Sequence, residues 1–181
     1  IMVVLAASVC TRGGKPVLSR QFRDLPKARI EGLLASFPGL IDTASGAQHT
    51  TIETDSVRYV YQPLEELYMV LITNRASNIL QDIATLHLFA QIVTATCKAS
   101  CSEQEILRSA FDLITAFDEV CTLGYRENVN LSQVRNFLEM DSHEERIQEI
   151  IERNKEQEAT EERKKRAKQL DAQRKELQRR G

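Results

Sequence analysis

Two short extended apolar segments separated by a turn open the chain. Small and β-branched apolar residues fill most of positions 3–11, Gly13 and Gly14 can adopt positive φ angles at low cost, and an extended pattern resumes at 16–22. Two extended runs joined by a glycine-containing turn indicate a β-hairpin. We therefore expect the chain to begin with two antiparallel strands.

A helical periodicity replaces this pattern after Pro26. Apolar residues then recur at the spacing that places them on one face of a helix: Ile30, Leu33, Leu34, Phe37 and Ile41. Pro26 suits a first helical turn, and the pair Pro38–Gly39 predicts that the helix ends nearby. Extended patterns at 50–54, 57–62 and 67–73 predict three more strands.

The sequence after these strands has a helical pattern. Ser77–Asn78 predicts the N-cap of one helix, and Ser102–Glu105 fits a capping box that opens another. The second of these helices is expected to end at Gly124 and to bury one apolar stripe: Leu107, Ala110, Phe111, Ile114, Phe117 and Cys121. A further short helix is expected after Asn130 or Ser132.

The element order ββαβββαα predicts an α+β fold, with three helices packed on a five-stranded, mainly antiparallel sheet. A body of about 140 residues is long enough for one hydrophobic core. We place this domain at 2–140 and assign 141–181 to a long polar helical extension. The segment Ser142–Glu145 fits a capping box that would open the extension.

The extension carries its charges in two blocks. Residues 141–162 hold nine acidic and three basic side chains, whereas 163–181 hold two acidic and nine basic side chains. Acidic residues precede basic residues by four positions at five places, and each such pair stabilises an exposed helix by about 0.2 to 0.5 kcal/mol. A solvated helix is the default interpretation, and contact with phosphate or lipid headgroups is the alternative for its basic run: Arg163, Lys164, Lys165, Arg166 and Lys168.

Composition argues against several classes of function. A net charge of −2 and a pI near 6.0 give no overall attraction to nucleic acid or anionic membranes. The four cysteines lie in apolar contexts, which favours buried thiols and a reducing compartment. Phosphate-loop, dinucleotide and zinc-protease motifs are missing, and His49, His87 and His143 lack ligand partners at metal spacing. We expect no catalytic residue, no metal site and no cofactor.

Apolar residues near the ends of elements are the candidate contacts for a protein partner. These are residues that the core may not need: Leu123, Tyr125, Val129, Ile147, Ile150 and Ile151. A second candidate patch contains Tyr59, Tyr61 and Tyr68, which neighbouring strands would place on one face of the sheet. A face covered by a helix is the favoured interpretation of these tyrosines, and a contact patch is the alternative.

Short segments along the chain form a recognisable series: 3–8, 19–22, 57–63, 68–74, 77–79, 117–120, 124–128 and 140–146. In this order they resemble the N-terminal part of the delta-subunit family of the COPI coatomer. The resemblance extends over essentially the whole chain, and the series is far more specific than any single motif. It implies a longin domain, the architecture shared by small and medium clathrin-adaptor subunits and by some SNARE proteins.

The resemblance also implies a function as a non-enzymatic assembly subunit. The family looks like the medium subunit of an adaptor-like tetramer, with the beta, gamma and zeta coatomer subunits as companions and the large beta subunit cradling the longin domain. An Arf GTPase would recruit the coat from the cytoplasm to Golgi membranes and COPI vesicles, for retrograde and intra-Golgi transport. Membrane association would occur only through the coat, without nucleic acid. The family's C-terminal mu-homology domain is missing here, so we expect a fragment.

Two alternatives stay open. A SNARE-like longin module needs apolar heptads over several turns of its tail, which this extension lacks beyond Ile151. A regulator of a small GTPase would present an exposed arginine, for which Arg58 and Arg126 are the candidates. The assembly subunit is the preferred hypothesis.

Overall fold

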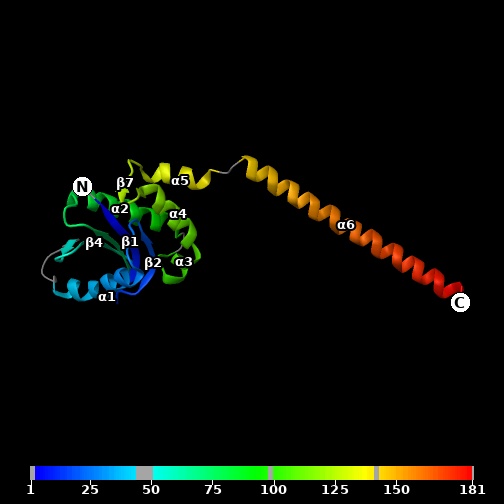
Figure 1. Ribbon diagram of the computed structural model, residues 1–181, viewed down its shortest axis with the longest axis horizontal. Coiled ribbons are helices and arrows are strands. Elements are labelled where there is room, and N and C mark those ends of the chain that lie inside the picture. Colours follow the sequence, from blue (N-terminus) through cyan, green and yellow to red (C-terminus); the bar gives the residue numbers. More distant parts are fainter. Residues whose placement is uncertain (1–2, 44–50, 98–99, 141–142, 181) are drawn as a thin grey trace. The chain divides into compact units, whose positions relative to one another are not determined.

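The chain divides into a body, residues 1–138, and a helical unit, residues 139–181. The computed structural model describes residues 3–43, 51–97, 100–140 and 143–180. In the body, helices lie on both faces of a central sheet (Figure 1). The helical unit consists mainly of one long helix.

The central sheet has the order β2-β1-β5-β4-β3, and every neighbouring pair is antiparallel. Its strands are β1 (Val4–Thr11), β2 (Pro16–Gln21), β3 (Thr51–Glu53), β4 (Arg58–Leu64) and β5 (Leu67–Thr73). The prediction of five strands is confirmed, with ends that differ by one or two residues. The middle strands β1 and β5 are buried along most of their length, because helices cover both of their faces.

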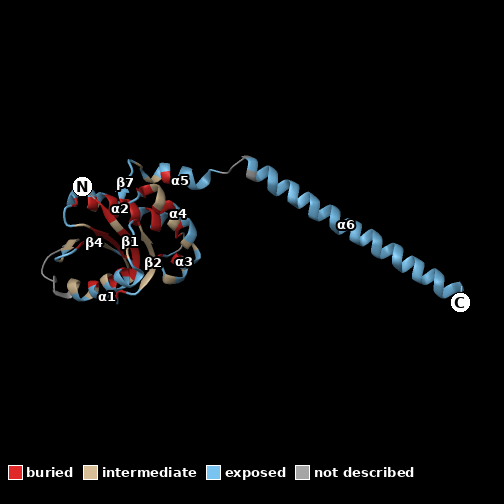
Figure 2. Cartoon of the chain, viewed as in Figure 1, coloured by how far each residue is buried: buried red, intermediate tan, exposed pale blue. Residues whose placement is uncertain are grey.

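Each face of the sheet has its own core. Helix α1 (Lys27–Thr43) covers one face and packs Leu34 and Phe37 against it. Helices α2 (Ile79–Thr96) and α4 (Ala110–Val120) cover the other face. There the ring of Phe89 lies 4.7 Å from that of Phe117 and 6.3 Å from that of Phe22, measured between centroids. Figure 2 shows buried residues on the inner sides of these layers.

Helix α1 continues through Pro38, so the end predicted there was wrong. Proline cannot donate a backbone hydrogen bond to the Leu34 carbonyl one turn earlier. The last turn is nevertheless held by packing, because Leu40 and Ile41 contact the core. Gly14 of the β1–β2 turn packs closely on the same region: its φ is +82°, and a Cβ there would collide with the Leu34 carbonyl oxygen and lie 2.9 Å from Pro38 Cγ.

The helix predicted to begin after Ser102 is divided at Ser109 into α3 (Glu103–Arg108) and α4. The division buries Ile106 and Leu113 and leaves Leu107 55% and Phe111 85% exposed. The predicted stripe was therefore wrong for Leu107 and Phe111. The sequence holds two overlapping apolar stripes, and packing against the sheet selects the other one.

The last predicted helix of the body is confirmed, but its surroundings differ from the prediction. α4 ends at Val120 rather than Gly124, and a small hairpin follows, formed by β6 (Cys121–Thr122) and β7 (Tyr125–Arg126). Helix α5 covers Leu131–Glu139. Asn130 and Gln133 cap it reciprocally, since each backbone N–H donates to the other side chain at 2.9 Å.

The other predicted features at helix ends and on the sheet have mixed outcomes. Asn78 accepts the Leu80 N–H at 3.0 Å and Ser102 accepts the Glu105 N–H at 3.3 Å, so both caps are confirmed. The cap expected at Ser142 lies outside the described residues.

Phe37 covers the tyrosines of the sheet, with ring centroids 5.6 Å from Tyr59 and 5.1 Å from Tyr61, which confirms the covered-face interpretation.

The helical unit contains α6 (His143–Arg180), a helix of 38 residues. At about 1.5 Å per residue it is about 57 Å long. Every described side chain of α6 is exposed (Figure 2). Its Glu176 and Arg180 form one of the acid-first pairs expected from the sequence, at 3.1 Å.

Candidate protein-interaction surface

The described residues contain no metal-binding cluster and no membrane-crossing helix. Within 3–43, 51–97, 100–140 and 143–180, no group of three or more His, Cys, Asp or Glu side chains is placed to hold a metal ion. In the same ranges, no helix combines the length and apolar character needed to cross a bilayer. The interior of the body also holds charged side chains and thiols.

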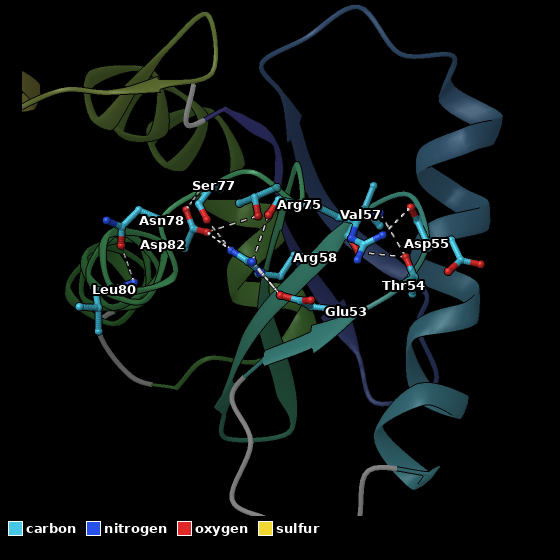
Figure 3. Close-up of polar contacts among 11 residues, drawn as sticks. Glu53, Thr54, Asp55, Val57, Arg58, Arg75, Ser77, Asn78, Leu80 and Asp82 are labelled. Carbon is cyan, nitrogen blue, oxygen red and sulfur yellow. Dashed lines mark hydrogen bonds and ion pairs between the residues drawn. The ribbon is translucent and has the colours of Figure 1, made fainter.

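The most deeply buried charges are Arg58 and Asp82 (Figure 3). Arg58 donates hydrogen bonds to the carbonyl of Ser77 at 2.6 Å, to the carbonyl of Arg75 at 3.1 Å and to a carboxylate oxygen of Glu53 at 2.7 Å. Asp82, in the first turn of α2, accepts from the Ser77 hydroxyl at 2.5 Å and lies 3.5 Å from Arg58. These contacts join α2 to β4 and to the loop after β5.

This arrangement has structural rather than reactive character. The Arg58 side chain is 10% exposed and its guanidinium is engaged on several sides, so the proposal of Arg58 as an exposed GTPase-regulating arginine was wrong. Burial raises the pKa of Asp82, while Ser77, Arg58 and Thr73 oppose that shift by stabilising the carboxylate. Removing either partner of this pair would leave the other charge buried and unpaired, which destabilises a fold.

The four thiols are also interior groups. Cys10, Cys97, Cys101 and Cys121 are all buried and none forms a disulfide. Burial raises the pKa of Cys10 and Cys121 to about 12 and that of Cys97 to about 11. Because the thiolate is the nucleophile, these cysteines are poor candidates for covalent chemistry.

The structure brings two of the candidate contact residues together on the β6–β7 hairpin. Leu123 is 70% exposed at its turn, and Tyr125, two residues later, is 44% exposed. Val129 has a different environment, because it is half-buried and packs against the core. Leu123 and Tyr125 therefore both present apolar surface from one hairpin, whereas Val129 is packed against the core.

The hairpin is fastened to the start of β1. The Val4 N–H of β1 donates to the Gly124 carbonyl of the turn at 2.7 Å. At the base of the hairpin, the Glu127 N–H donates to the Val120 carbonyl at 2.8 Å. The Arg23 guanidinium lies over the Tyr125 ring, 5.7 Å from its centroid. A cavity of about 350 Å³ lies beside the hairpin, with this lining: Arg20, Gln21, Phe22, Arg23, Asp118, Cys121, Thr122 and Leu123.

Sequence reasoning missed further exposed apolar residues. Leu107 and Phe111 project from α3 and α4, as the division at Ser109 requires. Helix α5 buries only Val134 among its described residues and leaves Phe137 and Leu138 exposed. The signal was available in α5, where Leu131, Val134, Phe137 and Leu138 share one helical face. For α3 and α4 no sequence signal could choose between the two stripes.

The candidate contact residues on α6 are all exposed. Ile147, Ile150 and Ile151 form a short apolar face near the start of the helix. The basic run is exposed throughout: Arg163, Lys164, Lys165, Arg166 and Lys168. Both sets are available for contact with another molecule, and nothing in the described part of α6 buries them.

Comparison with known proteins gives a consistent result. No family model matches the chain. The sequence is 62% identical over 179 residues to coatomer subunit delta of Schizosaccharomyces pombe, a match covering 99% of this chain and 73% of that protein. It is 55% and 54% identical to coatomer subunit delta of Saccharomyces cerevisiae and of Dictyostelium discoideum, covering 93% and 87% of this chain. These matches cover 31% and 28% of the two proteins, so the chain spans about a third of their length.

A structural comparison addresses the fold. One chain of a homology model of the full-length AP-3 complex in a stretched open conformation is similar, with a TM-score of 0.59 and 13% sequence identity. The match covers 85% of this chain and 98% of that chain. At this identity the likeness concerns the fold alone, and it confirms the α+β longin architecture expected from the sequence.

Proposed function

The chain belongs to the family of coatomer delta subunits, and on this basis we propose that it acts in the COPI coat as a non-enzymatic assembly subunit that docks to the large beta subunit. The observation that carries the proposal is the high identity to a coatomer delta subunit across nearly all of this chain. Its process would be Golgi-to-ER and intra-Golgi protein transport. The gamma and zeta subunits would complete an adaptor-like tetramer, and an Arf GTPase would recruit the coat from the cytoplasm to Golgi membranes.

The exposed apolar side chains of the body support a docking role. Leu107, Phe111, Leu123 and Tyr125 contribute apolar area that the core does not use. Burial of such area contributes about 25 cal/mol per Å² before the costs of association. A protein partner that covers these side chains would remove their apolar area from water.

We assign the partner contacts to Leu123 and Tyr125 on the body, with Val129 at their edge, and to Ile147, Ile150 and Ile151 on α6. The basic run beginning at Arg163 would supply a second, electrostatic contact to phosphate or lipid headgroups. The longin domain would comprise 2–140 and the extension 141–181, leading toward a mu-homology domain. Membrane association would then depend on the assembled coat.

The proposal is tested by coexpressing the chain with the beta, gamma or zeta coatomer subunit, one at a time, and copurifying each pair. We expect a stable one-to-one complex with the beta subunit that persists through size-exclusion chromatography. Failure to copurify with beta, when beta itself is folded and soluble, would contradict the proposed docking.

The contribution of α6 is tested separately with the double variant Ile147→Asp and Ile151→Asp. We expect weaker association with the beta subunit and an unchanged thermal transition of the body, because both side chains are exposed in the chain alone. Leu170→Asp is the matched control, since Leu170 is an exposed apolar residue farther along α6. Loss of the body's transition in the double variant would show that these isoleucines belong to a core.

A further inference from the structure

Among the described residues, only two that are not glycine have a positive φ: Glu65 and Leu123, each at 52°. In this left-handed region, Cβ of an L-residue crowds the following carbonyl oxygen, so Gly, Asn or Asp normally occupies it. A bulky residue in such a position is a reason to look for a compensating contact or a function. The two residues can be compared directly.

Glu65 has its compensation within the chain. Its carbonyl accepts a hydrogen bond from the Arg12 guanidinium at 2.9 Å, and its carboxylate accepts one from the Cys101 backbone N–H at 3.1 Å. These bonds tie the β4–β5 turn to the β1–β2 hairpin and to the start of α3. The unusual backbone at Glu65 is therefore explained by internal contacts.

Leu123 differs from Glu65, because its side chain is mostly exposed to water. Leu123 and Gly124 form a two-residue turn with φ angles of 52° and 88°, the pattern of a type I′ hairpin, which favours Asn-Gly. Only glycine fits at position 124, because a Cβ there would lie 2.8 Å from Val3 Cγ1 and 2.6 Å from the Val4 carbonyl oxygen. The turn is thus held against the body while the leucine projects outward.

The surroundings of Leu123 have the composition of an interface hot spot. The Arg23 guanidinium lies over the ring of Tyr125, two residues after Leu123, and Tyr and Arg are enriched where binding energy concentrates. Arg23 is exposed and has no ion-pair partner within the described ranges. A carboxylate on a partner surface would complement this charge.

We propose that the Leu123 turn is a preorganised anchor that inserts into an apolar pocket, rimmed by carboxylates, on the large coat subunit. The inference rests on the proposed function and specifies which element makes the decisive contact. Because Gly124 and the bond from Val4 already hold the turn in place, binding requires little further ordering of the backbone. Binding of the side chain by the partner would explain a leucine at a position that Asn would occupy with less strain.

The test replaces Leu123 by Asn in the full chain and measures both thermal stability and affinity for the beta coatomer subunit. Asn tolerates the left-handed backbone, so we expect Leu123→Asn to raise the unfolding temperature of the body by about 2 to 4 °C. We expect the same variant to bind beta at least about tenfold more weakly. A gain in stability together with a loss of affinity would show that the strained backbone at Leu123 serves binding.

Leu80→Asn is the matched control, because Leu80 is 74% exposed at the start of α2, in a helical backbone. We expect it to leave the affinity unchanged and to give no gain in stability. Arg23→Gln tests the acidic rim and should weaken binding and reduce its salt dependence.

The other possible results contradict either the anchor proposal alone or the proposed function as well. If Leu123→Asn is more stable but binds beta like the wild type, the anchor proposal is wrong while the proposed function stands. If it is less stable, Leu123 serves the fold, and the proposal is again wrong. If the wild-type chain itself does not bind beta, the proposed function fails and the anchor proposal fails with it.

Discussion

Helices α2 and α6 are both long, yet their surroundings differ in almost every respect. α2 has 18 residues, eight of them buried, and an ionic cluster fastens its first turn to the sheet. α6 has 38 residues, and every side chain described is exposed. The helices of the body therefore depend on tertiary packing, whereas α6 depends on helix propensity and local charge pairs. The same secondary structure has two different origins in one chain, and single substitutions can separate them.

The largest contrast should come from removing core volume. Phe89→Ala leaves a cavity between Phe22 and Phe117 and should destabilise the body by about 3 to 5 kcal/mol. Leu170→Ala removes an exposed apolar side chain from α6 and should change the free energy of unfolding by no more than about 0.5 kcal/mol. Chemical denaturation followed by circular dichroism measures both. Equal effects would remove the distinction between the two units.

Breaking an ion pair should also cost more stability in the body than on α6, although the difference should be smaller than for removing core volume. Arg58→Met leaves Asp82 buried without its cation and should cost about 3 kcal/mol. Arg180→Met breaks an exposed pair with Glu176 on α6 and should cost between about 0 and 1 kcal/mol. Thermal unfolding of both variants, compared with the wild type, measures the difference. If Arg58→Met were neutral, the buried cluster would not hold α2 in place.

Two glycines of the body should respond in opposite directions. Gly14→Ala forces a Cβ into the Leu34 carbonyl at a positive φ and should cost at least about 1 to 2 kcal/mol. Gly32→Ala lies inside α1 with open space around it and should stabilise by about 0.5 to 1 kcal/mol. Denaturant midpoints measure both changes. A tolerated Gly14→Ala would mean that the hairpin does not pack tightly on α1.

The buried thiols should make the body, but not α6, sensitive to alkaline pH. Unfolded thiols ionise near pH 9.0, whereas the folded chain keeps Cys10 and Cys121 protonated to about 12. Ionisation therefore favours the unfolded chain, and stability should fall as pH rises from about 9 toward 12. The same burial should make alkylation of the native thiols slow until the body unfolds. Rapid alkylation at neutral pH, measured by mass spectrometry, would contradict the described burial.

The smallest effect should be that of salt on α6. Its pairs are exposed, so screening should remove only a few tenths of a kcal/mol per pair. Raising the salt concentration to about 1 M should slightly reduce the helical circular dichroism signal of the full chain. A chain ending at residue 140 is the control and should show no such loss. A large loss in the control would place the salt-sensitive charges in the body.

Much of the fold follows from short-range patterns, and the exceptions have physical causes. The central strands were predictable because short apolar runs bounded by turn residues, such as Leu67–Thr73, favour buried strands when they are rich in β-branched and aromatic residues. The buried face of α3 and α4 could not be predicted. Ile106 and Leu107 each begin an apolar stripe, and only packing against the sheet decides which stripe is buried. The end of α1 was misplaced because tertiary contacts of Leu40 and Ile41 override the local effect of Pro38.

The candidate surface was predictable in part. Leu123 and Tyr125 stood out as apolar residues at the predicted end of a helix near Gly124, and the structure places both on one exposed hairpin. The left-handed backbone of Leu123 could not be anticipated, because its turn lacks the Asn-Gly signature and its strands have two residues each. Phe111 was assigned to the core, although it is among the most exposed large side chains of the body.

The most direct test of the account asks whether partner binding depends on apolar contacts of the body or on the charges of α6. The complex of the full chain with the beta coatomer subunit would be measured by size-exclusion light scattering at about 0.15 M and about 1 M salt, where the Debye length is about 8 and 3 Å. The account predicts a one-to-one complex at both concentrations. A complex that forms only at the lower salt concentration, or only when the basic half of α6 is present, would contradict it.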